Sequence, residues 1–261
     1  MAVVPNILET RRHLMPAIKF WVSPLCLELE PSDLGNSTPG YRERVILFDI
    51  LNAFHQAGGN FINIASNPQK PWIETTIGYW MKMRNTRKDM LIAISSESGV
   101  KEDSVMDSLE SSLRRLDRPW VDIFYVHQCD AATTLTKMMV PLTSAVKATH
   151  IKFLWALGRS LCEGRFRYPR LADRIVTQEL RKVATKADAT IANTALAYMK
   201  HVSPEAVPIV RVSSVKQLES RLQALHIKMT ASDIRQIAAA ASIRPIFSHE
   251  PLPYTRQQDA A

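Results

Sequence analysis

The chain has 261 residues, of which 46% are hydrophobic and 22% charged, as expected for a globular protein with one large core or two small ones. It contains no apolar run of the ~18 residues that a membrane-spanning helix needs, and residues 1–12 lack the apolar core and cleavage site of a secretory signal. Cys26, Cys129 and Cys162 have the spacing of neither a zinc site nor a disulfide framework. Composition therefore predicts a cytoplasmic protein with no membrane partner and no bound metal.

The net charge of +8 comes partly from one basic stretch, in which Glu163 is the only acidic residue among six cations. Such a stretch can bind nucleic acid or a phosphate-bearing small molecule, or it can be a solvated face. The chain has no recognition-helix signature, aromatic RNA-binding motif or zinc knuckle, so we expect no nucleic-acid partner. A phosphate-bearing cofactor is the better candidate, because a few cations suffice to bind it. The six cations are Lys147, Lys152, Arg159, Arg165, Arg167 and Arg170.

Short β-type runs alternate with amphipathic helices along the chain. Between residues 45 and 54 the apolar side chains share one helical stripe, and Gly58 with Gly59 predicts a left-handed helix end. Thr230 and Asp233 form a capping-box-like start for the last helix, whereas Pro141 should disturb its own helix. In chain order we predict strands at 21–27, 60–65, 90–95, 121–127, 151–156 and 207–212, and helices at 45–54, 73–83, 105–116, 135–148, 173–186, 190–199, 214–225 and from 230 onward.

This pattern predicts an α/β protein, either a (β/α)8 barrel or a doubly wound sheet. No G-x-G-x-x-G motif follows a predicted strand, which favours the barrel. We expect residues 1–20 to form an N-terminal arm, residues 21–241 the barrel, and residues 242–261 a C-terminal tail rich in proline and polar residues.

Five segments match the motifs of one family in order. Residues 61–69 (FINIASNPQ) resemble F-I-D-T-A-x-x-Y-Q, residues 77–82 (IGYWMK) resemble I-G-E-W-M-K, and residues 90–95 (MLIAIS) resemble a V-I-A-T-K strand. Residues 108–116 (SLESSLRRL) resemble S-L-x-x-S-L-x-R-L, and residues 122–127 (DIFYVH) resemble D-I-L-Y-V-H. Over roughly residues 21–240 the chain thus resembles the aldo-keto reductases. It is most similar to their fungal secondary-metabolism branch, with norsolorinic acid reductases, aryl-alcohol dehydrogenases and reductases of meroterpenoid clusters.

The resemblance implies a (β/α)8 barrel that uses NADP(H) on a small-molecule carbonyl or alcohol. Four residues carry the reduction in this family: a tyrosine proton donor, a lysine and an aspartate that lower its pKa, and a histidine that orients the carbonyl. At the matching positions this chain has Pro68, Ser95, Asn63 and His127. Only His127 is retained, and because it ends a predicted strand we expect it to face the pocket. Loss of the general acid alone implies a rate lower by ~100- to 10,000-fold.

The motifs that hold the cofactor in the family are also substituted. Residues 157–166 resemble the pyrophosphate loop P-W-x-x-L-G-x-G-R-F, with Cys162 in place of the middle glycine, although close backbone approach to a phosphate favours glycine. Residues 208–218 resemble P-I-V-G-G-R-K-x-E-H-L, which holds the adenosine 2′-phosphate, with Arg211 and Val212 in place of both glycines. The resemblance assigns cofactor binding to Ser160, Leu161, Gly164, Arg165, Phe166, Val210, Ser213, Gln217 and Arg221.

Three further charges bear on phosphate binding. Arg211 and Lys216 are new cations that could partly compensate for Ser213, which stands at the family's arginine position, although a solvated helix start is an equally good interpretation. Glu28 stands where the family has a glycine, and its carboxylate would oppose the binding of a phosphate.

A central block of the family's sequence is missing. Residues 153–154 match the start of the fifth family strand, yet residue 156 onward already matches the loop after the seventh strand. Two βα units of ~30 residues each are therefore absent. Because strand number, tilt and shear are linked in a barrel, the result should be an open sheet with unpaired edges, a smaller barrel, or a self-associating chain that completes itself.

We therefore expect a catalytically impaired relative of the NADPH-dependent carbonyl or alcohol oxidoreductases. The leading hypothesis is a pseudoenzyme of secondary metabolism, with meroterpenoid biosynthesis as the candidate pathway class. Three alternatives remain open. The chain could be a working reductase that uses Tyr79 or a water molecule as proton donor together with His127. It could bind a metabolite or act as a cyclase or isomerase without redox chemistry, with His127 as the acid–base group. It could also be the inactive product of a degenerate gene.

Overall fold

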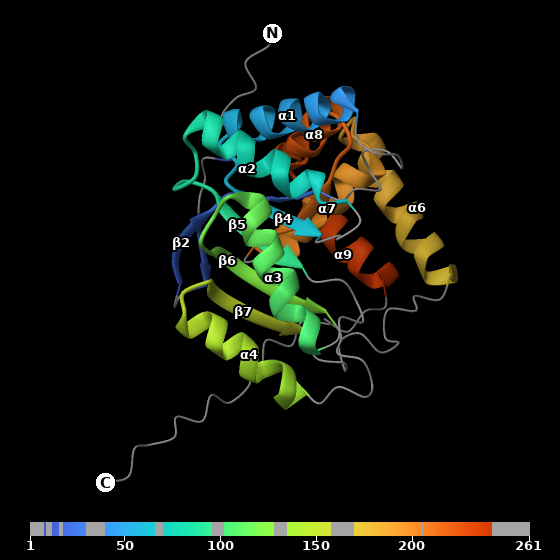
Figure 1. Cartoon of the computed structure of the whole chain (residues 1–261). Coiled ribbons are helices and arrows are strands. Elements are labelled where there is room, and N and C mark those ends of the chain that lie inside the picture. The colour runs from blue at the N-terminus through green and yellow to red at the C-terminus, as the bar shows by residue number, and fades with distance from the viewer. Residues whose placement is uncertain are drawn as a thin grey trace.

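The computed structural model describes residues 8, 12–15, 18–29, 40–65, 70–95, 102–127, 135–157, 170–204 and 206–241. Its centre is a parallel six-stranded sheet with the order β7-β6-β5-β4-β3-β8 (Figure 1). A separate antiparallel pair, β1 (Arg12–Met15) and β2 (Ile18–Val22), precedes the sheet. The sheet strands are β3 (Cys26–Leu29), β4 (Phe61–Ala65), β5 (Leu91–Ser95), β6 (Val121–His127), β7 (Ile151–Leu157) and β8 (Ile209–Arg211).

Helices follow the strands in the alternation that the sequence predicts. Both predicted helix-end motifs are confirmed, since Gly58 has a φ of 89° and Asp233 N–H donates to Thr230 Oγ1 at 3.1 Å. The helices are α1 (Tyr41–Gln56), α2 (Trp72–Arg84), α3 (Glu102–Leu116), α4 (Leu135–Lys147), α6 (Arg170–Lys186), α7 (Ile191–Val202), α8 (Val215–Gln223), the 3-10 turn η2 (Ala224–His226) and α9 (Ala231–Ala241).

The predicted strand over 21–27 is wrong, because the chain breaks between β2 and β3. Pro24 in the break has no N–H to donate to a sheet. Ser23 forms two hydrogen bonds outside the sheet ladder. Its N–H donates to Asn60 Oδ1 at 2.7 Å, and its hydroxyl donates to the Leu25 carbonyl at 2.7 Å. Asn60 Nδ2 in turn donates to the Trp21 carbonyl at 2.8 Å, so side-chain bonds join the β1–β2 pair to the start of β4.

The expected disturbance at Pro141 is also wrong, since α4 runs through this position without a break. Leu142 and Ala145, which follow it on the same helix, are both 1% exposed. Burial of these side chains stabilises α4 and offsets the backbone hydrogen bond that proline cannot make.

The pairing of β3 with β8 closes one side of the sheet as in a barrel, because the last strand lies beside the first. Cys26, Leu27 and Glu28 have Ile209, Val210 and Arg211 as their register partners. Among the described residues, β7 pairs only with β6, and β8 pairs only with β3. The sheet is therefore an opened barrel with its gap between β7 and β8. Of the three outcomes expected from the missing block, the structure shows the open sheet.

Alternate residues of each strand face either the helices or the opposite side, which we call the inner face. Leu27, Ile62, Ile92 and Phe124 pack against the helices in the main core. The inner face carries a smaller apolar cluster whose members are Val22, Cys26, Phe61, Leu91, Ala93 and Ile123. This alternation decides which side chains of the strand ends reach a site on the inner face.

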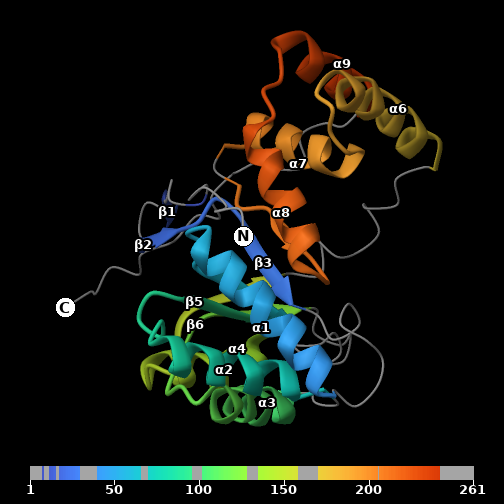
Figure 2. The same cartoon turned by 90° about the horizontal axis from the view of Figure 1, so that it is seen from above.

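The C-terminal helices form a group with a small core of its own beside β3 and β8 (Figure 2). In that group Leu180, Val183 and Ile237 are buried between α6, α7 and α9. Of the expected terminal segments, residues 1–20 contain β1 and part of β2, and residues 242–261 lie outside the described residues. In the described ranges, no helix has both the length and the apolar content needed to cross a membrane.

Candidate functional site

A row of polar side chains crosses the sheet near the carboxyl ends of β8, β3 and β4. Arg211 is the register partner of Glu28, and Glu28 is the register partner of Asn63. In a parallel sheet such partners lie on the same face, so the three side chains can meet across neighbouring strands. We call Arg211, Glu28 and Asn63 the inner-face row.

Both carboxylate oxygens of Glu28 are engaged within the row. Asn63 Nδ2 donates to Glu28 Oε1 at 2.9 Å, and Arg211 Nε donates to Glu28 Oε2. Asn63 is 4% exposed, and the Glu28 side chain is 15% exposed. The new carboxylate and the new cation that the sequence shows therefore neutralise each other, and Asn63 is held as a hydrogen-bond donor.

The other polar atom of the Asn63 amide has no partner among the described residues. Its Oδ1 atom is buried and accepts no hydrogen bond there. A buried acceptor without a donor costs about 1–3 kcal/mol, so the site has an unmet demand for an N–H or O–H group at this atom.

Ser95 and Tyr125 lie one register step further toward the carboxyl ends. The two residues are register partners on β5 and β6. Ser95 is buried, and its hydroxyl donates to the Ile64 carbonyl at 3.4 Å. Ser95, at the position that the resemblance gives to the catalytic lysine, is thus an uncharged, buried residue that bonds to the neighbouring strand β4.

Burial keeps the phenol of Tyr125 and the thiol of Cys26 protonated on this face. It raises the pKa of the Tyr125 phenol, and the nearby Cys26 thiol raises it further. Burial likewise raises the pKa of the Cys26 thiol, with a smaller increase from Glu28 and an opposing decrease from the Asn63 backbone N–H. At neutral pH neither group is a base or a nucleophile.

His127 is the last residue of β6 and has Leu157 as its register partner. Its backbone thus lies at the carboxyl end of the sheet, two positions after Tyr125, as expected. Pro68 lies outside the described residues. So do five of the expected cofactor residues, Ser160, Leu161, Gly164, Arg165 and Phe166.

The four cofactor positions that the structure describes have structural partners. Val210 is 6% exposed and packs in the core between sheet and helices. Ser213 N–H and Oγ both donate to Gln217 Oε1, at 2.8 and 3.1 Å, at the start of α8. Arg221 Nη1 donates to Asn193 Oδ1 at 3.0 Å and so joins α8 to α7.

These described positions do not fit NADP(H). The serine at the family's arginine position donates to the Gln217 side chain beside the N-cap residue Ser214, and the guanidinium of Arg211 is paired with Glu28. Lys216 is exposed in the first turn of α8 and forms no ion pair with another described residue. One lysine on the surface is a weak substitute for a bidentate arginine contact to a phosphate.

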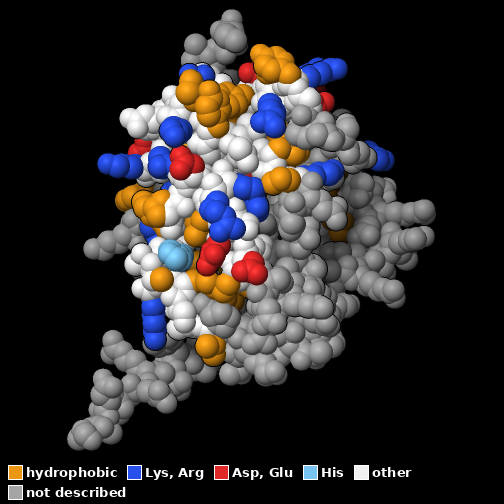
Figure 3. Space-filling view, in the orientation of Figure 1, with side chains coloured by type: hydrophobic (Ala, Val, Ile, Leu, Met, Phe, Trp, Pro, Cys, Tyr) orange, Lys and Arg blue, Asp and Glu red, His pale blue; other side chains and the backbone are white. Residues whose placement is uncertain are grey.

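Tyr79, the alternative proton donor considered from the sequence, is on the wrong side of the sheet. It is 57% exposed on α2 and lies against Phe48 of α1, with 5.9 Å between the ring centroids. Both rings line a groove of about 650 Å³ between these helices, and Figure 3 shows hydrophobic side chains gathered over α1 and α2. Tyr79 therefore cannot act together with His127.

Two features of the site were not predicted from the sequence. One is Tyr125, which lies two positions before His127 on β6 and has Ser95 as its register partner. Glu28 and Arg211 were considered separately. A barrel requires its first and last strands to pair, and this was the signal that could have placed the two charges side by side.

Comparisons with known proteins agree with this fold. The sequence model described as "Aldo/keto reductase family" matches residues 34–154 and 169–242. The chain belongs to the aldo/keto reductase family. The unmatched interval, residues 155–168, covers the last three residues of β7 and most of the segment before α6, where the missing block was expected.

Curated relatives place the chain near fungal enzymes. It is 24% identical to norsolorinic acid reductase B of Aspergillus parasiticus, over 95% of this chain and 88% of the relative. That alignment spans 338 positions, more than this chain has residues, so it includes long gaps. It is 23% identical to an aryl-alcohol dehydrogenase of Pestalotiopsis microspora, over 94% of this chain and 85% of the relative. It is 32% identical to the aldo-keto reductase ausK of Aspergillus calidoustus, over 58% of this chain and 42% of the relative.

A solved structure supports the same fold. The thermostable aldo-keto reductase Tm1743, crystallised with the inhibitor epalrestat, superimposes with a TM-score of 0.73. The match covers 88% of this chain and 99% of that chain at 20% sequence identity. The incomplete barrel expected from the sequence is thereby confirmed as an aldo-keto reductase fold.

The Glu28–Arg211 pair should stabilise the contact between β3 and β8. We expect Glu28→Gln and Arg211→Gln each to lower the free energy of unfolding by about 0.5–1.5 kcal/mol, a range that allows for solvent screening of the arginine. The double variant should lose less than the sum of the two, with a coupling of at least about 0.5 kcal/mol in urea unfolding.

The pair Lys182–Glu179 is a matched control, because its side chains are 55% and 20% exposed, against 54% and 15% for Arg211 and Glu28. This control pair lies within one helix, so the coupling free energy between its two substitutions should be about 0.3 kcal/mol, as is usual for such pairs. Additive effects of the two substitutions at Glu28 and Arg211 would contradict the role given to the row.

Proposed function

We propose that this chain is an aldo-keto reductase-fold protein of fungal secondary metabolism that does not reduce carbonyl groups with NADPH. The observation that carries the proposal is the inner-face row. An amide, Asn63, stands at the position that the resemblance gives to the catalytic aspartate, and it donates to a carboxylate already paired with Arg211.

The described groups of the inner face are poor proton donors for a forming alkoxide. Asn63 does not ionise, and Ser95 is a neutral hydroxyl bonded to a backbone carbonyl. Tyr125 has a raised pKa, which makes it a weaker acid than a free phenol. General acid catalysis is most effective when the donor's pKa lies near the working pH, so reduction here should be slow.

The row also disfavours the cofactor itself. The Glu28 carboxylate places a negative charge at the strand ends, and its partner Arg211 is not free to meet a phosphate. Introducing a phosphate there would require breaking this pair and desolvating the carboxylate near a second anion.

The names of the relatives support a role in secondary metabolism with a small-molecule carbonyl or alcohol as ligand. The resemblance to reductases of meroterpenoid clusters favours a ligand of that class. Three cysteines without disulfide spacing favour a cytoplasmic location.

A non-redox binding role is the second candidate, and one observation favours it. Asn63 Oδ1 is a buried acceptor without a donor in the described part of the chain, and a hydroxyl group of a bound metabolite would satisfy it. His127, at the end of the neighbouring β6, would be the acid–base group if such a ligand were converted.

A thermal-shift titration with NADPH and NADP+ tests the main proposal. We expect a cooperative unfolding transition whose midpoint does not move when either cofactor is added. A ligand that binds the folded protein would raise the midpoint, since at a hundred times its dissociation constant it adds about 2.7 kcal/mol of stability. Assays with aromatic aldehydes and quinones should show no NADPH oxidation above background.

The double variant Glu28→Gly, Arg211→Gly is the informative partner in this experiment, since it restores the glycines expected from the family. A shift that appears only in this variant would support the row as the cause of cofactor exclusion. A saturable shift in the unmodified chain, with turnover of a carbonyl substrate, would overturn the proposal.

We also propose that the chain self-associates through its open sheet edges. The described edges of β7 and β8 have unpaired backbone groups available to a second copy. We expect light scattering after size-exclusion chromatography to give a mass that rises from monomer to dimer with concentration. Ile209→Lys, at a half-exposed position of β8, should lower the dimer fraction, whereas a monomer at every concentration would contradict the proposal.

A further inference from the structure

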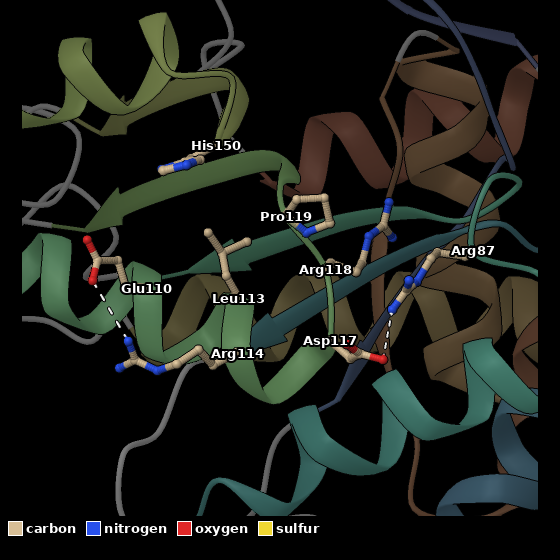
Figure 4. Close-up of a pocket in the computed structure, with 8 residues that line it drawn as sticks. All are labelled: Arg87, Glu110, Leu113, Arg114, Asp117, Arg118, Pro119 and His150. Carbon is tan, nitrogen blue, oxygen red and sulfur yellow. Dashed lines mark ion pairs between the residues drawn. The ribbon is translucent and has the colours of Figure 1, made fainter.

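A basic cavity lies at the end of the sheet opposite to the inner-face row. It has a volume of about 590 Å³ and is lined by arginines from separate turns together with His150 (Figure 4). Arg87 comes from the turn before β5, Arg118 from the turn before β6, and His150 from the turn before β7. Because the amino ends of parallel strands meet at one edge, these residues from distant segments line one cavity.

Cations outnumber carboxylates in the ion pairs of this cavity. Lys82 and Arg87 share Asp117, with N–O distances of 3.4 and 3.2 Å. Arg118 and Lys152 share Asp122, with distances of 3.6 and 2.6 Å. Of these residues only Arg87, Arg118 and Asp117 line the cavity, whose lining has three arginines and two carboxylates in all. At the rim, Arg114 is balanced by Glu110 at 3.8 Å.

The guanidinium groups of Arg118 and Arg87 also have buried N–H groups without acceptors among the described residues. Arg118 is 5% exposed, and its Nε atom has no hydrogen-bond partner among the described residues. The same holds for Nε and Nη2 of Arg87, although Nη2 is near enough to Asp117 for an ion pair. Buried donors in folded proteins are nearly always satisfied, so the Nε donors of Arg118 and Arg87, unsatisfied among the described residues, indicate a missing acceptor.

The neighbouring groups hold the two guanidinium groups in place. Arg118 lies over the Trp120 ring with 5.5 Å to the ring centroid, and its Nη1 contacts Met81 Sδ at 3.6 Å. Burial lowers the pKa of Arg118, the carboxylate of Asp122 opposes this decrease, and the positive charge of Arg87 adds a smaller decrease. Two arginine groups close enough to repel each other are favoured when an anion lies between them.

We propose that this cavity binds a phosphate- or sulfate-type oxoanion, with Arg87 and Arg118 as its principal donors. Such an anion accepts paired hydrogen bonds from guanidinium groups and would balance the excess of cations. Figure 4 shows Arg87 and Arg118 close together at one end of the cavity, while the Glu110–Arg114 pair lies at the other. His150 lines the remaining wall and adds a further N–H donor.

The test is a calorimetric titration of the full chain with inorganic phosphate and with sulfate at constant ionic strength, with chloride as the reference anion. Arg87→Gln removes one principal donor and leaves Arg118 paired with Asp122. Lys88→Gln is the matched control, because it removes the same charge one position along the chain from an exposed residue outside the cavity lining.

We expect saturable binding to the unmodified chain and to Lys88→Gln, and an affinity at least about tenfold lower for Arg87→Gln, the size expected for loss of a charge-assisted hydrogen bond. If Arg87→Gln does not fold, Arg114→Gln at the exposed rim replaces it and should weaken binding about threefold or more. No saturable binding, or equal affinities for the cavity variant and Lys88→Gln, would overturn the proposal.

Discussion

The parallel pairing of β3 with β8 is the contact on which the rest of this structure depends. It places the last strand beside the first, and it fixes the register that brings Arg211 to Glu28. It also brings α8 against α1, so that Leu218 and Leu222 are buried in the main core with Leu47 and Ile50. With this pair in place the sheet keeps the curvature of a barrel although two βα units are missing, and its gap falls between β7 and β8.

The opening of the barrel and the substitutions on its inner face lead to the same functional conclusion. A reductase of this family needs a proton donor and a bound nicotinamide cofactor at the carboxyl ends of the strands. Here those ends carry a neutral amide, a neutral hydroxyl and an ion pair between two new charges. The molecule retains the scaffold, and the proposed loss of hydride transfer rests on these substitutions of its inner face.

Local patterns in the sequence were sufficient for most elements and for individual substitutions. The spacing of Val105, Leu109, Leu113 and Leu116 predicts the buried stripe of α3, and all four are at most 7% exposed. Gly78, in one of the segments that resemble the family, lies where a Cβ would come within 2.6 Å of the Leu116 carbonyl, so this motif reflects helix packing. The predicted first strand is wrong because Pro24 has no N–H to donate and because Ser23 bonds with Asn60, 37 positions away, a contact that no local pattern contains. The Glu28–Arg211 pair joins residues 183 positions apart, and the basic cavity joins three turns, so both required the fold.

Hydrogen exchange measured by mass spectrometry, with and without saturating NADPH, tests the central claim most directly. Peptides from β3, β4, β5 and β6 should be protected as expected for a folded sheet, because their backbone groups are paired and their helix-facing side chains are buried. NADPH should leave exchange unchanged throughout, including the segment from β8 through α8. Slower exchange in that segment on addition of NADPH would contradict the account, since it would mean that the cofactor binds despite the Glu28–Arg211 pair.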